Sequence, residues 1–398
     1  MSTAPDVLQV LADRFEPEAF DAPSGRARLR LEVAGLGRWD ALADGGLELV
    51  EADTDRRADA RISADAATWR RLGADVRGGM DAFRSGRLAI RDDLHLGIGF
   101  LAATSGSTDL ERLEVGRVRT ELGDIAVLRA GAGDPVVLIH GLGASKVSFL
   151  PTVAALASSY RVLAIDLPGH GDSVKPLGAT YDPRYFAHAV AGFLDACGID
   201  RAHLVGNSMG GRVALEVGFR HPGRTRRIAL LAPSLAWRRD RGWAPLVRVL
   251  RPELGLIQPA PRAIVDQLVR RLIPGAHDGW PAVGVDEFLR SYSTPRGRAA
   301  FYAALRNIYL DEPEGPEGFW TRLRELQSDS LFVWGRQDTL VPIAFARHVR
   351  EALPAARHVE LDCGHVPQLE RPAETHAAIK RFFAAKRAGT ARTPAARS

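Results

Sequence analysis

The chain has 398 residues, a length that predicts two domains, each able to bury a hydrophobic core of its own. Hydrophobic residues make up 46% of the chain and charged residues 25%, which excludes disordered and fibrous classes and is typical of globular proteins. The formal net charge of +5 comes from arginines scattered along the chain rather than from a basic block, so we expect no nucleic-acid partner.

The same inventory constrains the compartment. The chain has two cysteines, Cys197 and Cys363, too few for a disulfide framework, and we interpret both as reduced thiols. Residues 1–10 lack the basic region and apolar core of a signal peptide. No apolar run reaches the roughly 18 residues of a membrane span. We therefore expect a cytoplasmic protein without stable membrane insertion.

Residues 1–108 are predicted to form a first, smaller α+β unit. Charged and apolar residues alternate over 28–33, which predicts a half-buried strand. Residues 39–43 and 47–50 are predicted to be the arms of a hairpin around the turn-forming Asp44-Gly-Gly46. The remaining predicted elements are a helix around 7–11, a strand at 61–63, a helix capped by Asp65, a short helix at 80–83, a strand from Gly86, and a helix after Asp92-Asp93 with Leu94, Ile98 and Leu101 on one face.

Three segments of this unit resemble the sterol-carrier-protein-type lipid-binding domain. They are Ala58-Asp-Ala-Arg-Ile-Ser63, Asp81-Ala-Phe-Arg-Ser-Gly-Arg-Leu-Ala-Ile90 and Asp92-Asp-Leu94. The resemblance covers most of residues 25–105 and implies a mixed sheet with helices over an apolar tunnel that can hold lipid. The alternative is a collapsed tunnel in a domain used for packing, for homodimer formation or for presenting substrate.

A second unit is predicted over residues 109–386, after a linker at 104–109. Its expected strands are 117–120, 125–128, 136–139, 162–165, 203–205, 228–231, 331–334 and 358–361. The first two are predicted to be an antiparallel pair. Because the later strands alternate with helices, we expect a mostly parallel, doubly wound sheet.

An insertion at about 235–325 interrupts this alternation and is predicted to be a helical lid. Amphipathic patterns predict helices at 263–272 and 299–309. Four tryptophans are interpreted as the core of the lid: Trp237, Trp243, Trp280 and Trp320. Residues 387–398 are basic and poor in large apolar side chains, so we predict a disordered tail.

The pattern Gly206-x-Ser208-x-Gly210 follows the strand at 203–205 and precedes a predicted helix at 212–219. This is the pattern of a nucleophile elbow, in which a serine is held on a strained turn between a strand and a helix. Glycines two residues before and after leave room for the turn. The neighbouring helix N-terminus favours developing negative charge. The alternative is an inert turn serine.

A serine nucleophile needs a base and a carboxylate that orients the base. His365 and Asp338 each follow a predicted strand, in the chain order Ser, Asp, His, so we expect them to be the base and the acid. Asp362 is the rival acid. His140 and His170 are rival bases, but each lies in a turn before a glycine and is better suited to shaping the pocket floor. His188, His203 and His221 are interpreted as local structural residues.

The oxyanion of the tetrahedral intermediate needs preorganised donors. We expect the backbone N–H of Met209 and that of Leu142, with Gly143 as second choice. His140, Gly141 and Gly143 are predicted to line the substrate pocket. The sequence contains no spaced Cys/His cluster, so we expect no metal and no cofactor.

Residues 117–385 resemble the α/β-hydrolase family. The resemblance is carried by five ordered segments: His140-Gly-Leu-Gly143, Asp166-Leu-Pro-Gly-His-Gly-Asp-Ser173, Gly206-Asn-Ser-Met-Gly210, the Asp338 loop and the His365 loop. It implies an α/β-hydrolase fold with a lid, with Ser208 as nucleophile, Asp338 as acid and His365 as base. A serine rather than an aspartate at the elbow argues against haloalkane dehalogenases and soluble epoxide hydrolases.

We therefore expect a serine hydrolase of the carboxylesterase or lipase type, acting on a small apolar ester or a lipid-like substrate held or delivered by the first unit.

Transfer of the acyl group to an alcohol would share the same acyl-enzyme. A second alternative is hydrolysis of a carbon–carbon bond in a ring-fission product, because Gly206-Asn-Ser-Met-Gly-Gly211 is similar to the elbow of such enzymes. In those enzymes, the loop that corresponds to His140-Gly-Leu-Gly-Ala-Ser145 of this chain is usually richer in Gly and Pro. A third alternative is a non-catalytic lipid carrier. The lid arginines Arg238, Arg239 and Arg262 could bind a carboxylate or lie on the surface.

Overall fold

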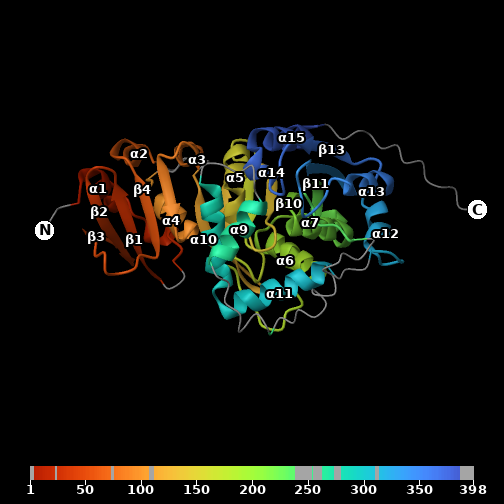
Figure 1. The fold of residues 1–398 in the computed structure, drawn as a ribbon, viewed down its shortest axis with the longest axis horizontal. Helices are drawn as coiled ribbons and strands as arrows, with labels where there is room; N and C mark the ends of the chain where they lie inside the picture. The colour runs from red at the N-terminus through yellow and green to blue at the C-terminus, as the bar shows by residue number, and fades with distance from the viewer. Residues whose placement is uncertain are drawn as a thin grey trace, which may run out of the picture.

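Two β-sheets organise the molecule, one in each predicted unit (Figure 1). The computed structural model describes residues 4–22, 25–72, 76–106, 112–237, 253, 262–272, 279–309 and 313–385. The predicted linker lies partly outside these residues, and the predicted tail lies wholly outside them. Within the described residues, no helix is both long and apolar enough to cross a membrane.

The first unit is a five-stranded sheet with the strand order β3-β2-β1-β4-β5. Strand β1 pairs antiparallel with β2 and parallel with β4, so the sheet is mixed. Its elements are α1 (Asp6–Asp13), a 3-10 helix (Pro17–Ala19), β1 (Arg26–Val33), β2 (Gly37–Asp44), β3 (Leu47–Glu51), β4 (Ala60–Ala64), α2 (Ala66–Arg71), α3 (Val76–Arg84), β5 (Leu88–Arg91) and α4 (Leu94–Ala103). The predicted hairpin and the Asp65 cap, which accepts a hydrogen bond from the Thr68 amide, are both confirmed.

Helix α4 differs from its prediction. The pattern indicated one buried face, but every residue of the helix except Leu101 is buried, including His95. The reason is that α4 packs on β4 and β5 on one side and on β6 of the second unit on the other. A sequence pattern records only apolar periodicity, so it does not show that a second domain covers the opposite face.

The second unit is an eight-stranded sheet with the order β13-β12-β11-β10-β8-β9-β7-β6. The strands from β8 to β13 pair in parallel, while β7 pairs antiparallel with both β6 and β9, which confirms a mostly parallel sheet. The strands are β6 (Glu114–Thr120), β7 (Gly123–Ala130), β8 (Pro135–Ile139), β9 (Arg161–Ile165), β10 (Ala202–Asn207), β11 (Thr225–Leu231), β12 (Asp329–Gly335) and β13 (Arg357–Leu361).

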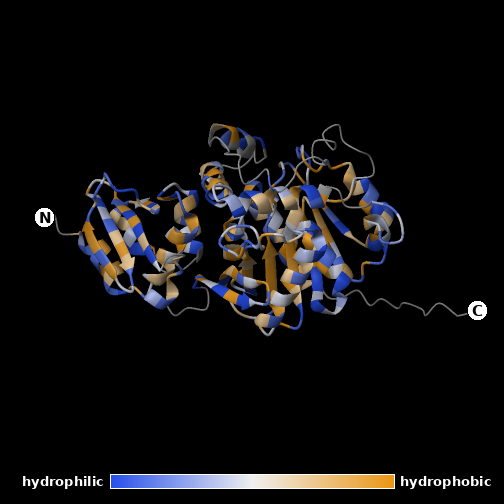
Figure 2. Ribbon diagram, turned by 90° about the horizontal axis from the view of Figure 1, so that it is seen from below, coloured by the Kyte–Doolittle hydropathy of each residue, from blue (hydrophilic) through white to orange (hydrophobic). Residues whose placement is uncertain are grey.

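Helices cover both faces of this sheet, and its central strands consist largely of buried apolar residues (Figure 2). Alternate residues of the strands enter two hydrophobic clusters, one beneath α5 and α15 and the other beneath α6, α7 and α13. These helices and the shorter ones near them are 3-10 helices at Lys146–Phe149 and Pro222–Arg224, α5 (Leu150–Leu156), α6 (Pro183–Ala196), α7 (Met209–Arg220), α13 (Phe345–Ala352), α14 (Pro367–Glu370) and α15 (Pro372–Ala384).

The lid lies between β11 and β12 in the sequence. Its described helices are α9 (Arg262–Leu272), α10 (Trp280–Tyr292), α11 (Pro295–Tyr309) and α12 (Phe319–Arg324). The helices expected at 263–272 and 299–309 are confirmed, whereas α10 was not predicted. Trp280 and Trp320 are buried as expected, and Trp237 packs edge-on against Phe345. Trp243 lies outside the described residues.

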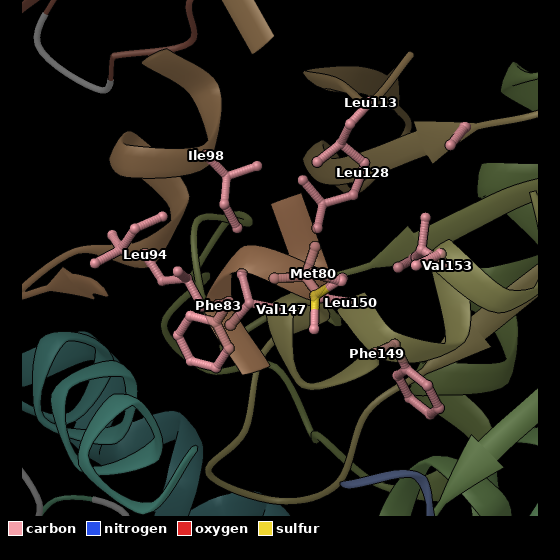
Figure 3. Close-up of a cluster of buried hydrophobic side chains, with 14 of the residues drawn as sticks. Met80, Phe83, Leu94, Ile98, Leu113, Leu128, Val147, Phe149, Leu150 and Val153 are labelled. Carbon is pink, nitrogen blue, oxygen red and sulfur yellow. The ribbon is translucent and has the colours of Figure 1, made fainter. Parts of the chain in front are cut away.

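A shared apolar core joins the two units. Met80 and Phe83 of α3 and Ile98 of α4 belong to one hydrophobic cluster with Leu128 and Leu150 of the second unit (Figure 3). A cavity of about 70 Å³ lies within this junction. Its lining residues are Leu72, Gly79, Met80, Phe83, Leu88, Ile90, Leu94, Ile98, Leu101, Ala102, Leu113, Leu150 and Trp280.

This cavity bears on the resemblance to a sterol-carrier-type domain. The mixed sheet with helices has the architecture that the resemblance implies, but membership of that family stays a prediction. The volume is below the roughly 150 Å³ of an apolar cavity that binds benzene. In the shape seen here, the cavity is therefore too small for a lipid chain.

Candidate active site

Ser208 lies on the turn between β10 and α7, with φ 53° and ψ −117°. This is a region that residues other than glycine rarely occupy, so the backbone is strained. A Cβ atom on Gly210 would lie 1.9 Å from the carbonyl oxygen of Ile139, and one on Gly206 would lie 2.2 Å from that of Gly210. Both positions therefore require glycine, and the predicted strand–turn–helix is confirmed.

Backbone hydrogen bonds hold the strained turn in place. The N–H of Ser208 donates to the carbonyl of Leu231 at 3.0 Å, and the N–H of Ser234 donates to the carbonyl of Ser208 at 2.9 Å. The turn is thus tied to the end of β11 on either side of the serine, which fixes where its side chain begins.

Asp338 and His365 form a buried hydrogen-bonded pair. His365 Nδ1 lies 2.8 Å from Asp338 Oδ2, and both residues are less than 10% exposed. The other carboxylate oxygen, Oδ1, accepts from the backbone N–H groups of Leu340 and Val341 at 2.8 and 2.9 Å. The rival Asp362 instead accepts from the side chain of Gln337. The structure therefore joins the pair that was predicted from the sequence.

Two contacts bring the three loops of the site together. The side-chain amide of Asn207 donates to the carbonyl of His365 at 3.1 Å, so the residue before Ser208 holds the His365 loop. A Cβ atom on Gly141 would lie 3.3 Å from the Cβ of Ser208. The loop that follows β8, residues 140–146, thus lies directly against the serine, and we call it the oxyanion loop.

The predicted donors lie on either side of this contact. Met209 is the first residue of α7. The backbone N–H groups at a helix N-terminus have no partner within the helix, and the helix dipole favours negative charge there. Leu142 follows Gly141 in the oxyanion loop and is half-buried. Gly143 has a φ of 72°, and its backbone faces the ring of Phe288 on α10. The roles of these residues in binding substrate and oxyanion stay predictions.

Both ring nitrogens of His140 lie within hydrogen-bond distance of backbone groups. Its Nε2 accepts from the backbone N–H of Leu167 at 3.0 Å, so the proton of the neutral ring is on Nδ1, which lies 2.7 Å from the carbonyl of Gly141. Burial lowers the pKa of His140, which keeps the ring neutral. Burial also lowers the pKa of His170 to about 3. His140 therefore connects the oxyanion loop to the end of β9.

Sequence reasoning missed Glu370, which holds the two residues that flank His365. Its carboxylate accepts from the backbone N–H of Gly364 at 2.9 Å and from that of Val366 at 3.0 Å, and it is 4% exposed. The signal available was a lone acidic residue five positions after a histidine. That signal is weak, because the contact depends on how the loop turns into α14.

A buried group of charges behind the oxyanion loop was also missed. Lys146 is fully buried, and its ammonium donates to Asp166 at 2.7 Å and to Asp172 at 2.8 Å. Burial would raise the pKa of Asp172, but Lys146 and Arg290 hold it well below its usual value. Asp166 also accepts from the backbone N–H of Lys146. The aspartates of the 166–173 segment therefore anchor the end of the oxyanion loop.

Arg238 and Arg239 lie outside the described residues, and Arg262 begins α9 with a side chain that is not described. The idea that one of them binds a carboxylate stays a prediction.

The model of the alpha/beta hydrolase family matches residues 136–378. The chain is 29% identical to 2-hydroxymuconate semialdehyde hydrolase of Pseudomonas sp. strain CF600, over 68% of this chain and 94% of that protein. It is also 29% identical to the dihydrolipoyllysine-residue acetyltransferase component of the acetoin cleaving system of Cupriavidus necator, over 85% of this chain and 89% of that protein.

Among solved structures, one described as a membrane phospholipase A and bacterial virulence factor is 30% identical, with a TM-score of 0.58. The match covers 68% of this chain and 86% of that chain. The similar proteins thus have names that point to different reactions on one fold, so the fold alone does not select a substrate.

Proposed function

Because the chain belongs to the alpha/beta hydrolase family, we propose that it is a serine hydrolase that cleaves an apolar carboxylic ester through an acyl-enzyme. The observation that carries the proposal is the buried 2.8 Å contact between His365 and Asp338, held beside the elbow by Asn207. A histidine oriented by a carboxylate is the base that a serine hydroxyl needs at neutral pH.

In the proposed reaction, Ser208 Oγ attacks the ester carbonyl while His365 Nε2 takes the hydroxyl proton. The N–H groups of Met209 and Leu142 stabilise the resulting oxyanion. The intermediate collapses, the acyl–oxygen bond of the ester breaks, and the alcohol leaves with the proton from His365. A water molecule, activated by the same histidine, then hydrolyses the acyl-enzyme and releases the acid. Asp338 keeps Nδ1 protonated throughout.

Covalent labelling tests the nucleophile. A fluorophosphonate probe is expected to modify the wild-type protein at Ser208 and to leave Ser208→Ala unmodified. Ser330→Ala is a matched control, because that buried serine lies on β12 and its hydroxyl has no hydrogen-bond partner among the described residues. A folded wild-type protein that resists the probe would instead support the non-catalytic carrier.

A second candidate is hydrolysis of a carbon–carbon bond. It is favoured by the similarity to 2-hydroxymuconate semialdehyde hydrolase, whereas the similarity to a phospholipase A supports ester cleavage. We retain the ester as first choice, because the loop His140-Gly-Leu-Gly-Ala-Ser145 lacks the Gly- and Pro-rich sequence expected of the alternative. Turnover of nitrophenyl esters of increasing acyl length, compared with turnover of a 2-hydroxy-6-oxo-dienoate, separates the two reactions.

We also propose that the first unit holds the apolar part of the substrate in the cavity at the junction of the units. The support is that every residue lining the cavity is apolar or glycine, including Leu150 and Trp280 from the second unit. Binding a chain requires the cavity to widen. Native mass spectrometry with a long-chain fatty acid is expected to show one bound molecule, and the cavity-filling Ile98→Trp is expected to abolish it. Equal binding by both proteins would contradict this site.

A further inference from the structure

One carboxylate joins three parts of the molecule at the junction of the units. Glu287 lies on α10 of the lid and is 5% exposed. Its Oε2 accepts from the hydroxyl of Ser145, at 2.9 Å, and Ser145 belongs to the oxyanion loop. Its Oε1 accepts from the backbone N–H of Leu94, at 3.1 Å, and Leu94 is the first residue of α4 in the first unit.

Helix α10 is itself fixed by ion pairs with both units. Arg290 donates to Glu287 at 3.0 Å and to Asp172 of the second unit at 2.5 and 3.2 Å. Arg91 of the first unit pairs with Asp286 at 2.7 Å. Because these partners lie on both sides of the helix, rotation of α10 would break several buried contacts. Glu287 is therefore presented to Ser145 from a fixed position.

The same helix contacts the backbone of the oxyanion loop. A Cβ atom on Gly143 would lie 2.8 Å from the ring of Phe288, the neighbour of Glu287. Gly143 follows Leu142, whose N–H is one proposed oxyanion donor. Helix α10 thus meets the loop at two points, Gly143 and Ser145, immediately after that donor.

Joining the two units does not by itself explain the bond to Ser145. Arg91 with Asp286, and Arg290 with Asp172, already connect the lid to each unit. Buried ion pairs of this kind add little net stability, because desolvation offsets most of their attraction. The hydroxyl of Ser145 extends the network to the loop that carries the oxyanion donor.

We propose that Glu287 is a positioning residue for the oxyanion loop, and that the first unit supports catalysis through it. The proposal rests on the proposed function, since it assigns the loop an oxyanion to bind. The first unit orients Glu287 through the Leu94 amide, and Glu287 holds Ser145 so that the Leu142 N–H keeps its direction.

The variant Ser145→Ala tests the link with the smallest change. The oxyanion exists only in the transition state, so a displaced donor lowers kcat while KM for the ester stays near the wild-type value. We expect kcat to fall by up to about a hundredfold, because a displacement of about 1 Å at a reacting group can cost that much. Ser145→Thr, which retains the hydroxyl, is expected to restore most of the activity. Ser330→Ala, a buried serine without a partner among the described residues, controls for loss of a hydroxyl.

The contribution of the first unit is tested by Arg91→Met, which removes its ion pair with α10. The matched control is Arg38→Met, because Arg38 pairs with Glu32 on the exposed surface of the same unit. We expect Arg91→Met to lower kcat with little change in KM, and Arg38→Met to match the wild-type protein.

Hydrogen exchange of the loop provides a readout that does not depend on turnover. Faster exchange of the amides at 141–146 in Ser145→Ala than in Ser330→Ala supports the proposal, and equal exchange overturns it. A wild-type-like kcat in Ser145→Ala also overturns it, even where the melting temperature falls. Fluorophosphonate labelling of the wild-type protein separates this failure from failure of the proposed function, because labelling reports Ser208 directly.

Discussion

At the scale of single residues, the backbone around Ser208 can adopt few conformations. Ser208 has a positive φ, and the two glycines around it cannot carry a Cβ atom without meeting backbone oxygens. A residue other than glycine in such a conformation costs about 1–3 kcal/mol, which the rest of the fold must offset. The proposed function gives a reason for a serine at this position, because the proposed reaction requires its hydroxyl.

This strain predicts an unusual order of stability. We expect Ser208→Gly to be about 1 kcal/mol more stable to unfolding than Ser208→Ala, since glycine adopts positive φ without a steric penalty. Urea unfolding of the two variants gives the comparison. At Ser148, which lies in a short helix, the order should be reversed. If alanine were the more stable residue at both positions, position 208 would not be strained.

At the scale of elements, each catalytic candidate depends on a neighbouring segment. The elbow depends on β11, the oxyanion loop on α10 and on the 166–173 segment, and the His365 loop on α14. In each case a side chain makes the hydrogen bond: Asn207 donates to the carbonyl of Leu231 at the end of β11, and the carboxylates of Glu287, Asp166 and Glu370 accept from the loops. The loops are therefore held by buried polar contacts, which have strong directional preferences.

Glu370 gives a test at this scale. In Glu370→Gln the amide nitrogen cannot accept a hydrogen bond, so one flanking N–H of the His365 loop loses its acceptor. We expect kcat to fall roughly tenfold, and the free energy of unfolding to fall by about 1–3 kcal/mol, because a buried N–H is left unpaired. Steady-state kinetics and urea unfolding measure the two effects.

The matched control is Glu374→Gln, an exposed glutamate in the first turn of α15. It should leave both quantities unchanged. Wild-type kcat in Glu370→Gln would mean that the His365 loop keeps its position without the second hydrogen bond.

At the scale of the whole molecule, buried neutral histidines link stability to pH. Burial lowers the pKa of His170 and that of His376 to about 3, below the ordinary value of 6.5. The unfolded chain therefore binds protons below about pH 6.5 that the folded chain does not bind. Stability is then lost as the pH falls from 6.5 towards 3, by about 1.4 kcal/mol per pH unit for each such histidine.

His376 provides the variant for this effect. In His376→Gln one titrating group is removed, so the unfolded chain binds about one proton fewer between pH 6.5 and 4.5. The slope of the unfolding free energy against pH should therefore be smaller by about 1.4 kcal/mol per pH unit. Urea unfolding at several pH values measures the slope. His188→Gln, at an exposed position on α6, controls for the replacement of a histidine by glutamine. An unchanged slope in His376→Gln would show that this residue is not buried in its neutral form.

The sequence by itself determined the mostly parallel sheet, the elbow and the pairing of Asp338 with His365. Each of these has a local signature: a run of apolar residues, a glycine spacing, or a polar residue just after a strand. Strand ends meet at one edge of a parallel sheet, so local signals were sufficient to place these groups together.

Only the tertiary structure decided the burial of α4, the existence of α10, the charges around Lys146 and the bonds of Glu287 and Glu370. Glu287 accepts hydrogen bonds from Ser145 and Leu94, which precede it in the sequence by 142 and 193 positions. The sequence around Glu287 gives no sign of either contact. Such contacts depend on how one unit lies on another. The physical reason is that a buried carboxylate needs hydrogen-bond donors or cations as partners. Which distant residues supply them depends on how the elements pack, and the neighbouring sequence does not show this.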